Sequence, residues 1–314
     1  MPMKYHSTFF INLCAASSAL LLAACGGGGG GSETENTAPS TPIVINANNS
    51  VAVASEVIST TLASDDASTV LGAKTDSGSG LNLNNINKNI IQIIANHSSN
   101  GQIVSGIVEA CSLGGSISKP DTKFGTYVFN NCMEPDLNIN GNLTVSGSGD
   151  LINSFNGSYR FGNLSITTPS GTDVINGSIN TSWTFDGTLE TGSTSSQKLS
   201  LISGADFYDL INLQDDYTSN NNIQIDTDII SYTMNSSLLD GQVTLSTPIQ
   251  IQSYTYNDYP FAGQIICIGA NNSKVKASVN PGGSGISSDT VTIETDADGD
   301  DVYELSQVLM WSEL

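Results

Sequence analysis

Carboxylates are concentrated near the C-terminus, in the segment T-D-A-D-G-D-D-V-Y-E at residues 295–304. Alternating aspartates provide the hard oxygen ligands that Ca²⁺ prefers in proteins. A loop holding them would bring several carboxylates to one point, where a divalent cation would relieve their repulsion. The residues that could take part are Asp296, Asp298, Asp300, Asp301 and Glu304.

The register of this segment differs from that of an EF-hand. An EF-hand loop needs a glycine at position 6 and a glutamate at position 12. With Asp296 at position 1, these positions hold Asp301 and Gln307, and the flanking segments have the pattern of strands. An EF-hand is therefore excluded, and a tight hairpin loop is predicted. Two interpretations remain open: a weak structural Ca²⁺ site of millimolar class, or a solvated acidic turn.

The sequence contains few of the residues and motifs that known catalytic mechanisms require. Once a leader peptide is removed, His97 is the one histidine of the chain, and no serine lies in a G-x-S-x-G motif. His-rich zinc sites and Ser-His-Asp triads are therefore not expected. A pair of carboxylates acting on a glycosidic bond is compatible with the composition, but nothing in the sequence selects the pair. We expect a protein that is not an enzyme, with a glycan-active enzyme as one alternative.

The leader is recognisable in residues 1–24. Lys4 precedes an apolar run that is short for a membrane span, and the run ends in Leu22-Ala23-Ala24-Cys25. This segment resembles the lipobox of bacterial lipoprotein precursors. The resemblance implies that Cys25 is lipidated, with palmitate among its acyl chains, and becomes the mature N-terminus. Anchoring to a membrane through this lipid follows from it.

Residues 25–42 read as a tether. Six glycines follow Cys25 and lead into a segment of Ser, Thr, Pro and Glu that has little to bury. About 20 residues of such coil would hold a domain on the order of 25 Å from the lipid. The residue after Cys25 is Gly26, not aspartate, and by resemblance to the lipoprotein sorting rule this favours the outer membrane. A periplasmic and a cell-surface orientation are both compatible with the sequence.

The other cysteines fit an oxidising compartment. Cys111 and Cys132 bracket two strand-like segments, and a disulfide between them is predicted. Cys267 lies in the apolar run I-I-C-I, which favours a buried and inert thiol. The mature chain has 8 basic and 30 acidic residues, a formal net charge of −22. This charge opposes binding to nucleic acid.

Two helices are predicted near the start of the domain, at 50–62 and 82–96, because apolar residues recur there every three or four positions. A short strand at 43–47 precedes them. From residue 101 onward the period changes to two. Asn-Gly pairs at 140–141, 156–157 and 176–177 would normally indicate hairpin turns. Here the apolar alternation runs through each pair, so we place them inside strands, at bulges or bends.

Further strands are expected at 198–202, 207–213, 222–226, 229–234, 242–245, 249–256, 262–269, 274–279, 290–295 and 302–311. The predicted fold of residues 43–314 is therefore mainly β: one large curved antiparallel sheet, a meander forming an open or partial barrel, with two short N-terminal helices. An aromatic group at 254–261 is expected to pack in the core or at a strand edge.

The paired cysteines, the repeated Asn-Gly strands, the turn G-A-N-N-S-K-V at 269–275 and the acidic loop together resemble a set of uncharacterised β-rich lipoproteins of Gram-negative bacteria. The resemblance implies architecture and location. We therefore expect an outer-membrane lipoprotein with a structural, adhesive or ligand-binding β domain, whose protein or glycan partner the sequence leaves unidentified. A periplasmic carrier of lipid or another hydrophobic ligand is the other alternative. No cofactor is expected to be required, apart from the Ca²⁺ considered above.

Overall fold

The computed structural model describes residues 39–62, 108–135, 137–151, 153–169, 171–255, 259–280 and 289–314. These ranges contain one α-helix, fourteen strands and two short 3-10 helices, which confirms a mainly β fold. The leader, Cys25, His97 and the helix predicted at 82–96 lie outside the described residues.

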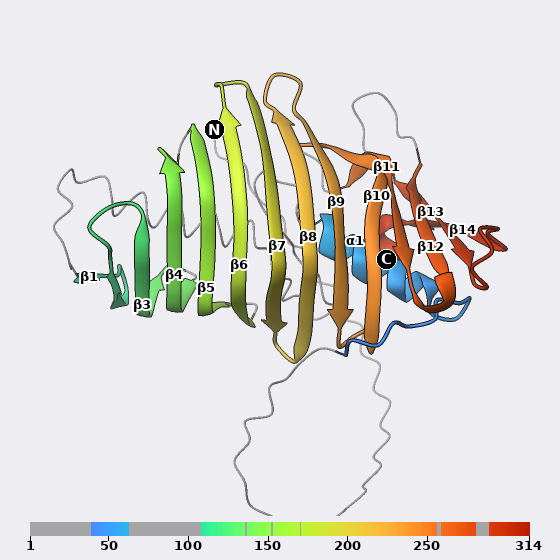
Figure 1. Cartoon of the computed structure of the whole chain (residues 1–314), viewed down its shortest axis with the longest axis horizontal. Coiled ribbons are helices and arrows are strands. Elements are labelled where there is room, and N and C mark those ends of the chain that lie inside the picture. The colour runs from blue at the N-terminus through green and yellow to red at the C-terminus, as the bar shows by residue number, and fades with distance from the viewer. Residues whose placement is uncertain are drawn as a thin grey trace, which may run out of the picture. The chain divides into compact units, whose positions relative to one another are not determined.

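The fourteen strands form one antiparallel sheet in which each strand pairs with its sequence neighbours (Figure 1). Strands β1 and β14 stand at opposite ends of this order, so the described sheet is open, as expected for a meander. The strands are β1 (Val108–Ala110), β2 (Gly114–Ser118), β3 (Gly125–Glu134), β4 (Leu137–Gly149), β5 (Ser154–Thr168), β6 (Gly171–Phe185), β7 (Leu189–Ser203), β8 (Asp206–Asn220), β9 (Ile225–Ser236), β10 (Gly241–Tyr254), β11 (Pro260–Ile268), β12 (Lys274–Val279), β13 (Thr290–Asp296) and β14 (Leu305–Met310).

Alternation along the strands separates two faces of the sheet. The inner face, against which the helix packs, carries buried Tyr, Phe, Leu, Ile and Val side chains contributed by β2 to β13. The outer face carries mostly Ser, Thr, Asn and Asp. Burial of the apolar set is the main driving force for folding of such a sheet.

The three Asn-Gly pairs lie inside β4, β5 and β6, as predicted. At Gly141 the pairing of β4 with β5 shifts register, and φ is 114°. A Cβ there would approach the Asn163 carbonyl oxygen to 2.4 Å, so glycine permits the close contact of the two strands. Similar shifts occur in the pairs β3–β4, β5–β6, β6–β7 and β8–β9, whereas β7 and β8 pair in one register, so bulges recur across much of the sheet. Bulges increase local twist.

Some predicted boundaries are wrong. Residues 43–46 are irregular, and the chain there makes one isolated parallel bridge, between Pro42 and Gln242. Residues 221–224 form the β8–β9 turn, and the strands predicted at 222–226 and 229–234 are one strand, β9, which begins at Ile225. The strands predicted at 242–245 and 249–256 are one strand, β10, with irregular pairing around residues 246–253.

Helix α1 (Ser50–Leu62) confirms the first predicted helix. It buries Val53, Ala54, Val57 and Ile58 against the inner face. Thr61 Oγ1 lies 3.3 Å from the Tyr232 hydroxyl of β9, and Ser55 donates a hydrogen bond to the Leu314 carbonyl. Tertiary packing therefore holds a helix whose composition has low intrinsic propensity.

The predicted disulfide is present. Cys111, in the β1–β2 connection, is bonded to Cys132 of β3, and their Cα atoms are 5.4 Å apart. Cys267 is a buried free thiol, and burial raises its pKa, as an inert core cysteine requires. Among the described residues, no helix has the length and apolar character needed to cross a membrane.

Candidate calcium-binding loop

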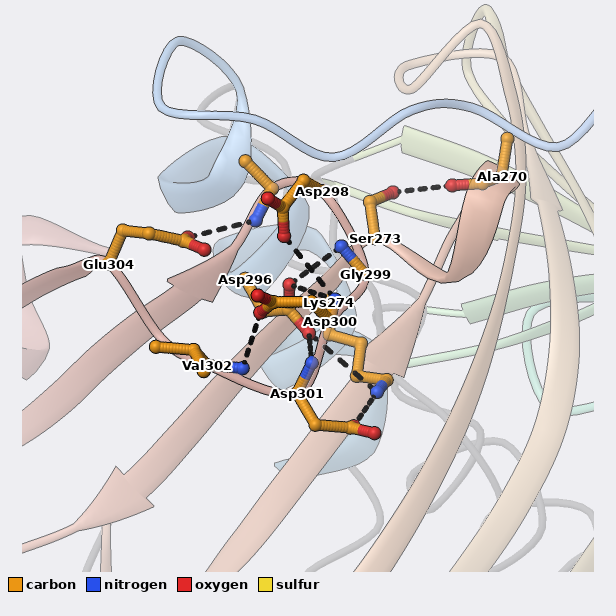
Figure 2. Close-up of polar contacts among 11 residues, drawn as sticks. Ala270, Ser273, Lys274, Asp296, Asp298, Gly299, Asp300, Asp301, Val302 and Glu304 are labelled. Carbon is orange, nitrogen blue, oxygen red and sulfur yellow. Dashed lines mark hydrogen bonds and ion pairs between the residues drawn. The ribbon is translucent and has the colours of Figure 1, made fainter.

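The predicted acidic loop joins β13 to β14 at the tip of the last hairpin of the sheet (Figure 2). Asp296 is the last residue of β13, and residues 297–304 lead to β14. The paired strands are in continuous register from Thr295↔Leu305 to Thr290↔Met310, so the loop has a fixed base.

The side chain of Asp296 is fully buried under the loop (0 % exposed) and holds the loop through hydrogen bonds to its backbone. Its Oδ1 accepts hydrogen bonds from the backbone N–H groups of Gly299, at 2.7 Å, and Asp300, at 3.2 Å. Its Oδ2 accepts one from the N–H of Asp301, at 3.0 Å. A buried carboxylate must be compensated in this way to avoid a large desolvation cost.

Three further carboxylates converge on Asp296. Asp298, Asp300 and Glu304 each place one oxygen so that these atoms and one from Asp296 all lie within 4.8 Å of one another. All three are exposed. Partial desolvation, followed by repulsion from Asp300, raises the pKa of the Asp298 carboxyl. Four carboxylates at this spacing repel one another, and a divalent cation would relieve that repulsion.

Hydrogen bonds inside the loop hold these side chains in place. Asp298 Oδ1 accepts the Asp300 N–H at 3.3 Å, and Asp300 Oδ1 accepts the Val302 N–H at 2.8 Å. Glu304 Oε2 accepts the Ala297 N–H at 3.2 Å, which joins the two ends of the loop. Asp298, Asp300 and Glu304 thus each retain an oxygen that no described hydrogen bond uses, whereas both oxygens of Asp296 are occupied.

Asp301 does not belong to this group of four. Its backbone takes the left-handed conformation, with φ of 70°, at the position where an EF-hand has glycine. Its side chain is 81 % exposed and forms a short ion pair with Lys274. The predicted five-residue set therefore divides into four converging carboxylates and one partner for a lysine.

Lys274 is the cation built into this site. Its ammonium lies 3.7 Å from Asp296 Oδ2, and β12 and β13 are in register at this pair, Lys274↔Asp296. The hydrogen bond to Asp301 raises the lysine pKa. A second lysine, Lys276, pairs with Glu294 at 2.7 Å and lies 4.0 Å from the ring centroid of Tyr303. Positive charge therefore lies next to Asp296 and Asp301, whereas no ion pair among the described residues involves Asp298, Asp300 or Glu304.

The turn before β12 supports the loop. Gly299, with φ of 79°, approaches this turn so closely that a Cβ would lie 2.4 Å from the Asn271 carbonyl oxygen. Ser273 is fully buried, and its hydroxyl accepts the Ile45 N–H at 2.8 Å and donates to the Ala270 carbonyl at 2.7 Å (Figure 2). The acidic loop therefore sits on a turn that is itself fixed to the domain.

Sequence reasoning missed a second set of carboxylates, which lies on the inner face. Asp215 of β8 and Asp226 and Asp228 of β9 are all at most 5 % exposed. Burial, followed by repulsion from Asp216, raises the pKa of Asp215 to about 7. The alternation within the strand was the available signal, because Asp228 shares the parity of the buried residues Ile230, Tyr232 and Met234 of β9.

The comparisons with known proteins return no match: no protein-family model, no curated protein and no solved structure is significantly similar to the chain.

Proposed function

We propose that the protein is a lipid-anchored outer-membrane protein whose β domain serves as a non-enzymatic structural, adhesive or ligand-binding module. In this proposal Cys25 carries the lipid, residues 25–42 are the tether, and a Ca²⁺ ion at the acidic loop stabilises the last hairpin. The observation that carries the calcium part is the convergence of Asp296, Asp298, Asp300 and Glu304 within 4.8 Å.

Ca²⁺ binds six to eight oxygens at about 2.3–2.6 Å in flexible geometry. Four carboxylates provide part of that shell, and water would complete it at the exposed side of the loop. Lys274 opposes binding, because its ammonium is 3.7 Å from Asp296 Oδ2. An affinity of millimolar class, typical of extracellular sites, is therefore expected.

The outer face of the sheet supports a role in contact with polar partners. Threonine hydroxyls pair across neighbouring strands at Thr126–Thr144, Thr167–Thr172, Thr184–Thr191, Thr218–Thr227 and Thr233–Thr244, at 2.6 to 3.3 Å. Such pairs stabilise the sheet and leave a hydroxyl-rich surface exposed to solvent. That surface is suited to hydrogen bonding with a protein or a glycan.

Calcium binding is tested by titration calorimetry on the mature protein after treatment with a chelator. The unmodified chain is expected to bind one Ca²⁺, and D298N to weaken binding by about tenfold, since it removes one charged ligand. Lys274→Met is expected to strengthen binding, because it removes a cation beside Asp296. Asp121→Asn, in the β2–β3 connection far along the sheet, is the matched control. Absence of binding, or equal affinity in all four proteins, would contradict the proposal.

Anchoring is tested separately by expressing the full precursor in a Gram-negative host with labelled palmitate. The unmodified protein is expected to incorporate label and to sediment with outer membranes. Cys25→Ser is expected to lose both properties. A variant that stays in the outer membrane fraction without label would refute lipid anchoring and leave the calcium result unaffected.

A further inference from the structure

The last strand, β14, presents an open edge in the described part of the sheet. The Trp311 N–H donates to the Asp289 carbonyl at 3.3 Å, toward β13. Backbone groups in a strand alternate between its two sides. The N–H and C=O groups of Ser306, Val308 and Met310 therefore point away from β13. The Met310 N–H is taken by Glu313 Oε2 at 2.7 Å, which leaves the groups of Ser306 and Val308 facing outward.

The two edges of the sheet differ in their protection. Strand β1 has three residues, and its central Glu109 forms an ion pair with Lys119. Short length and charge are the usual means by which proteins protect an edge strand. Strand β14 has six residues, L-S-Q-V-L-M, with no charge and no proline, and pairs with β13 without a bulge.

Exposed apolar side chains accompany the open edge of β14. Val308 is 61 % exposed and Met310 is 53 % exposed, and both lie on the outer face. Leu305 is 44 % exposed at the start of the strand. An incoming strand would pair with the backbone and cover part of this apolar surface, which is how β-strand addition combines affinity with specificity.

The charges that flank β14 indicate which kind of strand would pair with its open edge. Asp300 and Glu304 stand before β14, and Glu313 stands after it, so an uncharged strand lies between two acidic ends. A second copy pairing antiparallel with β14 would bring the acidic loop of each chain toward Glu313 of the other. Like charges so placed oppose association, as does the mature net charge of −22. An extended segment with basic ends and a β-branched centre has the complementary pattern.

We propose that β14 docks an extended strand of another polypeptide, with Lys or Arg at both ends and an uncharged β-branched centre, which adds to the sheet beyond β14. The proposal rests on the proposed role of the domain as a binding module and names the class of its partner. It requires neither the lipid on Cys25 nor bound Ca²⁺, so its test is independent of the tests of those two features.

The test uses the mature protein in detergent micelles and a fluorescein-labelled peptide, KKVTVTVKK, with anisotropy as the readout in the presence of chelator. Saturable binding is expected, weakened by salt because the end contacts are exposed charges. The peptide EEVTVTVEE should bind at least about tenfold more weakly at low salt. Equal binding of the two peptides would overturn the charge argument, and no binding of either would overturn the proposal.

Val308→Pro tests the edge itself. The Val308 N–H points outward, so proline removes a donor needed by an incoming strand and no hydrogen bond to β13. Binding should weaken by about tenfold, whereas Val308→Thr, which keeps the N–H, should bind within about threefold of the unmodified protein. Unchanged affinity in Val308→Pro would contradict the assignment of the docking edge.

A peptide-side control keeps the proposal testable if Val308→Pro fails to fold. KKVTVTVKK methylated on the backbone nitrogens of its five central residues keeps charge and side chains but has no central N–H donor. Its binding should be lost, and retained binding would refute strand addition. A dimer detected by sedimentation in the same micelles, and abolished in Val308→Pro, would overturn the proposed basic partner. It would show that a second copy of the chain pairs with β14 instead.

Discussion

Asp296→Asn is the substitution that tests the local physics of the acidic loop most sharply. The buried carboxylate accepts two N–H groups on Oδ1 and one on Oδ2, with Lys274 Nζ 3.7 Å from Oδ2. An amide has one acceptor oxygen. If that oxygen replaces Oδ1, the NH₂ group faces the Asp301 N–H and Lys274, which are both donors. The opposite orientation leaves the NH₂ group against the N–H groups of Gly299 and Asp300.

Either orientation removes at least one hydrogen bond to a charged acceptor and leaves a buried donor against another donor. Each such hydrogen bond contributes about 1.5–3 kcal/mol, and the loss of the charge partner of Lys274 adds to this. We therefore expect a decrease of about 3 kcal/mol in the free energy of unfolding.

The assay is urea denaturation followed by circular dichroism, with chelator present so that metal does not contribute. Asp298→Asn is the matched control, because its carboxylate is exposed and a change of only about 0.5 kcal/mol is expected. The slope of the free energy against urea should stay the same in both variants. A change in Asp296→Asn no larger than that in Asp298→Asn would refute the view that Asp296 organises the loop.

Three further predictions concern other parts of the domain. Burial raises the pKa of Asp215 to about 7, above its unfolded value of 3.8, so the stability that this group contributes is lost as pH rises from about 4 to 7. Asp215→Asn should therefore stabilise the protein more at pH 8 than at pH 4, by up to a few kcal/mol in urea denaturation, and an effect independent of pH would contradict this. Replacing Cys111 and Cys132 together by serine should lower stability by about 3 kcal/mol, and a variant as stable as the unmodified protein under oxidising conditions would count against it. Gly299→Ala should lower the melting temperature by several degrees, because the alanine Cβ would lie 2.4 Å from the Asn271 carbonyl oxygen. An unchanged melting temperature would show that the turn at Asn271 can move away at no cost in stability.

Most of the sheet could be predicted from the sequence because its signal is local. The apolar alternation continues without a change of parity through Gly141 and Gly177. A two-residue turn at either glycine would place residues of the same parity before and after it on opposite faces of the sheet, so a turn there was excluded. Both glycines lie inside strands at register shifts. Helix α1 was visible for the same reason, since Val51, Ala54, Ile58 and Leu62 recur every three or four positions.

Contacts between distant segments could not be predicted in this way. Asp301 pairs with Lys274 because β12 and β13 are in register at Lys274↔Asp296, and a local pattern says nothing about register between strands. The buried position of Asp215 was missed because the strand predicted at 207–213 ends before it, whereas β8 continues to Asn220. The support of the loop by Asn271 likewise depends on tertiary packing.

The central claim is that a lipid-anchored β domain binds one Ca²⁺ at its last hairpin. Native mass spectrometry of the mature protein, purified from the membrane of its own cell and measured with and without chelator, tests lipid anchoring and Ca²⁺ binding together. The account predicts a chain that begins at Cys25, carries acyl groups, and loses the mass of one Ca²⁺ when the chelator is added. A chain without acyl groups, or a mass unaffected by the chelator, would contradict it.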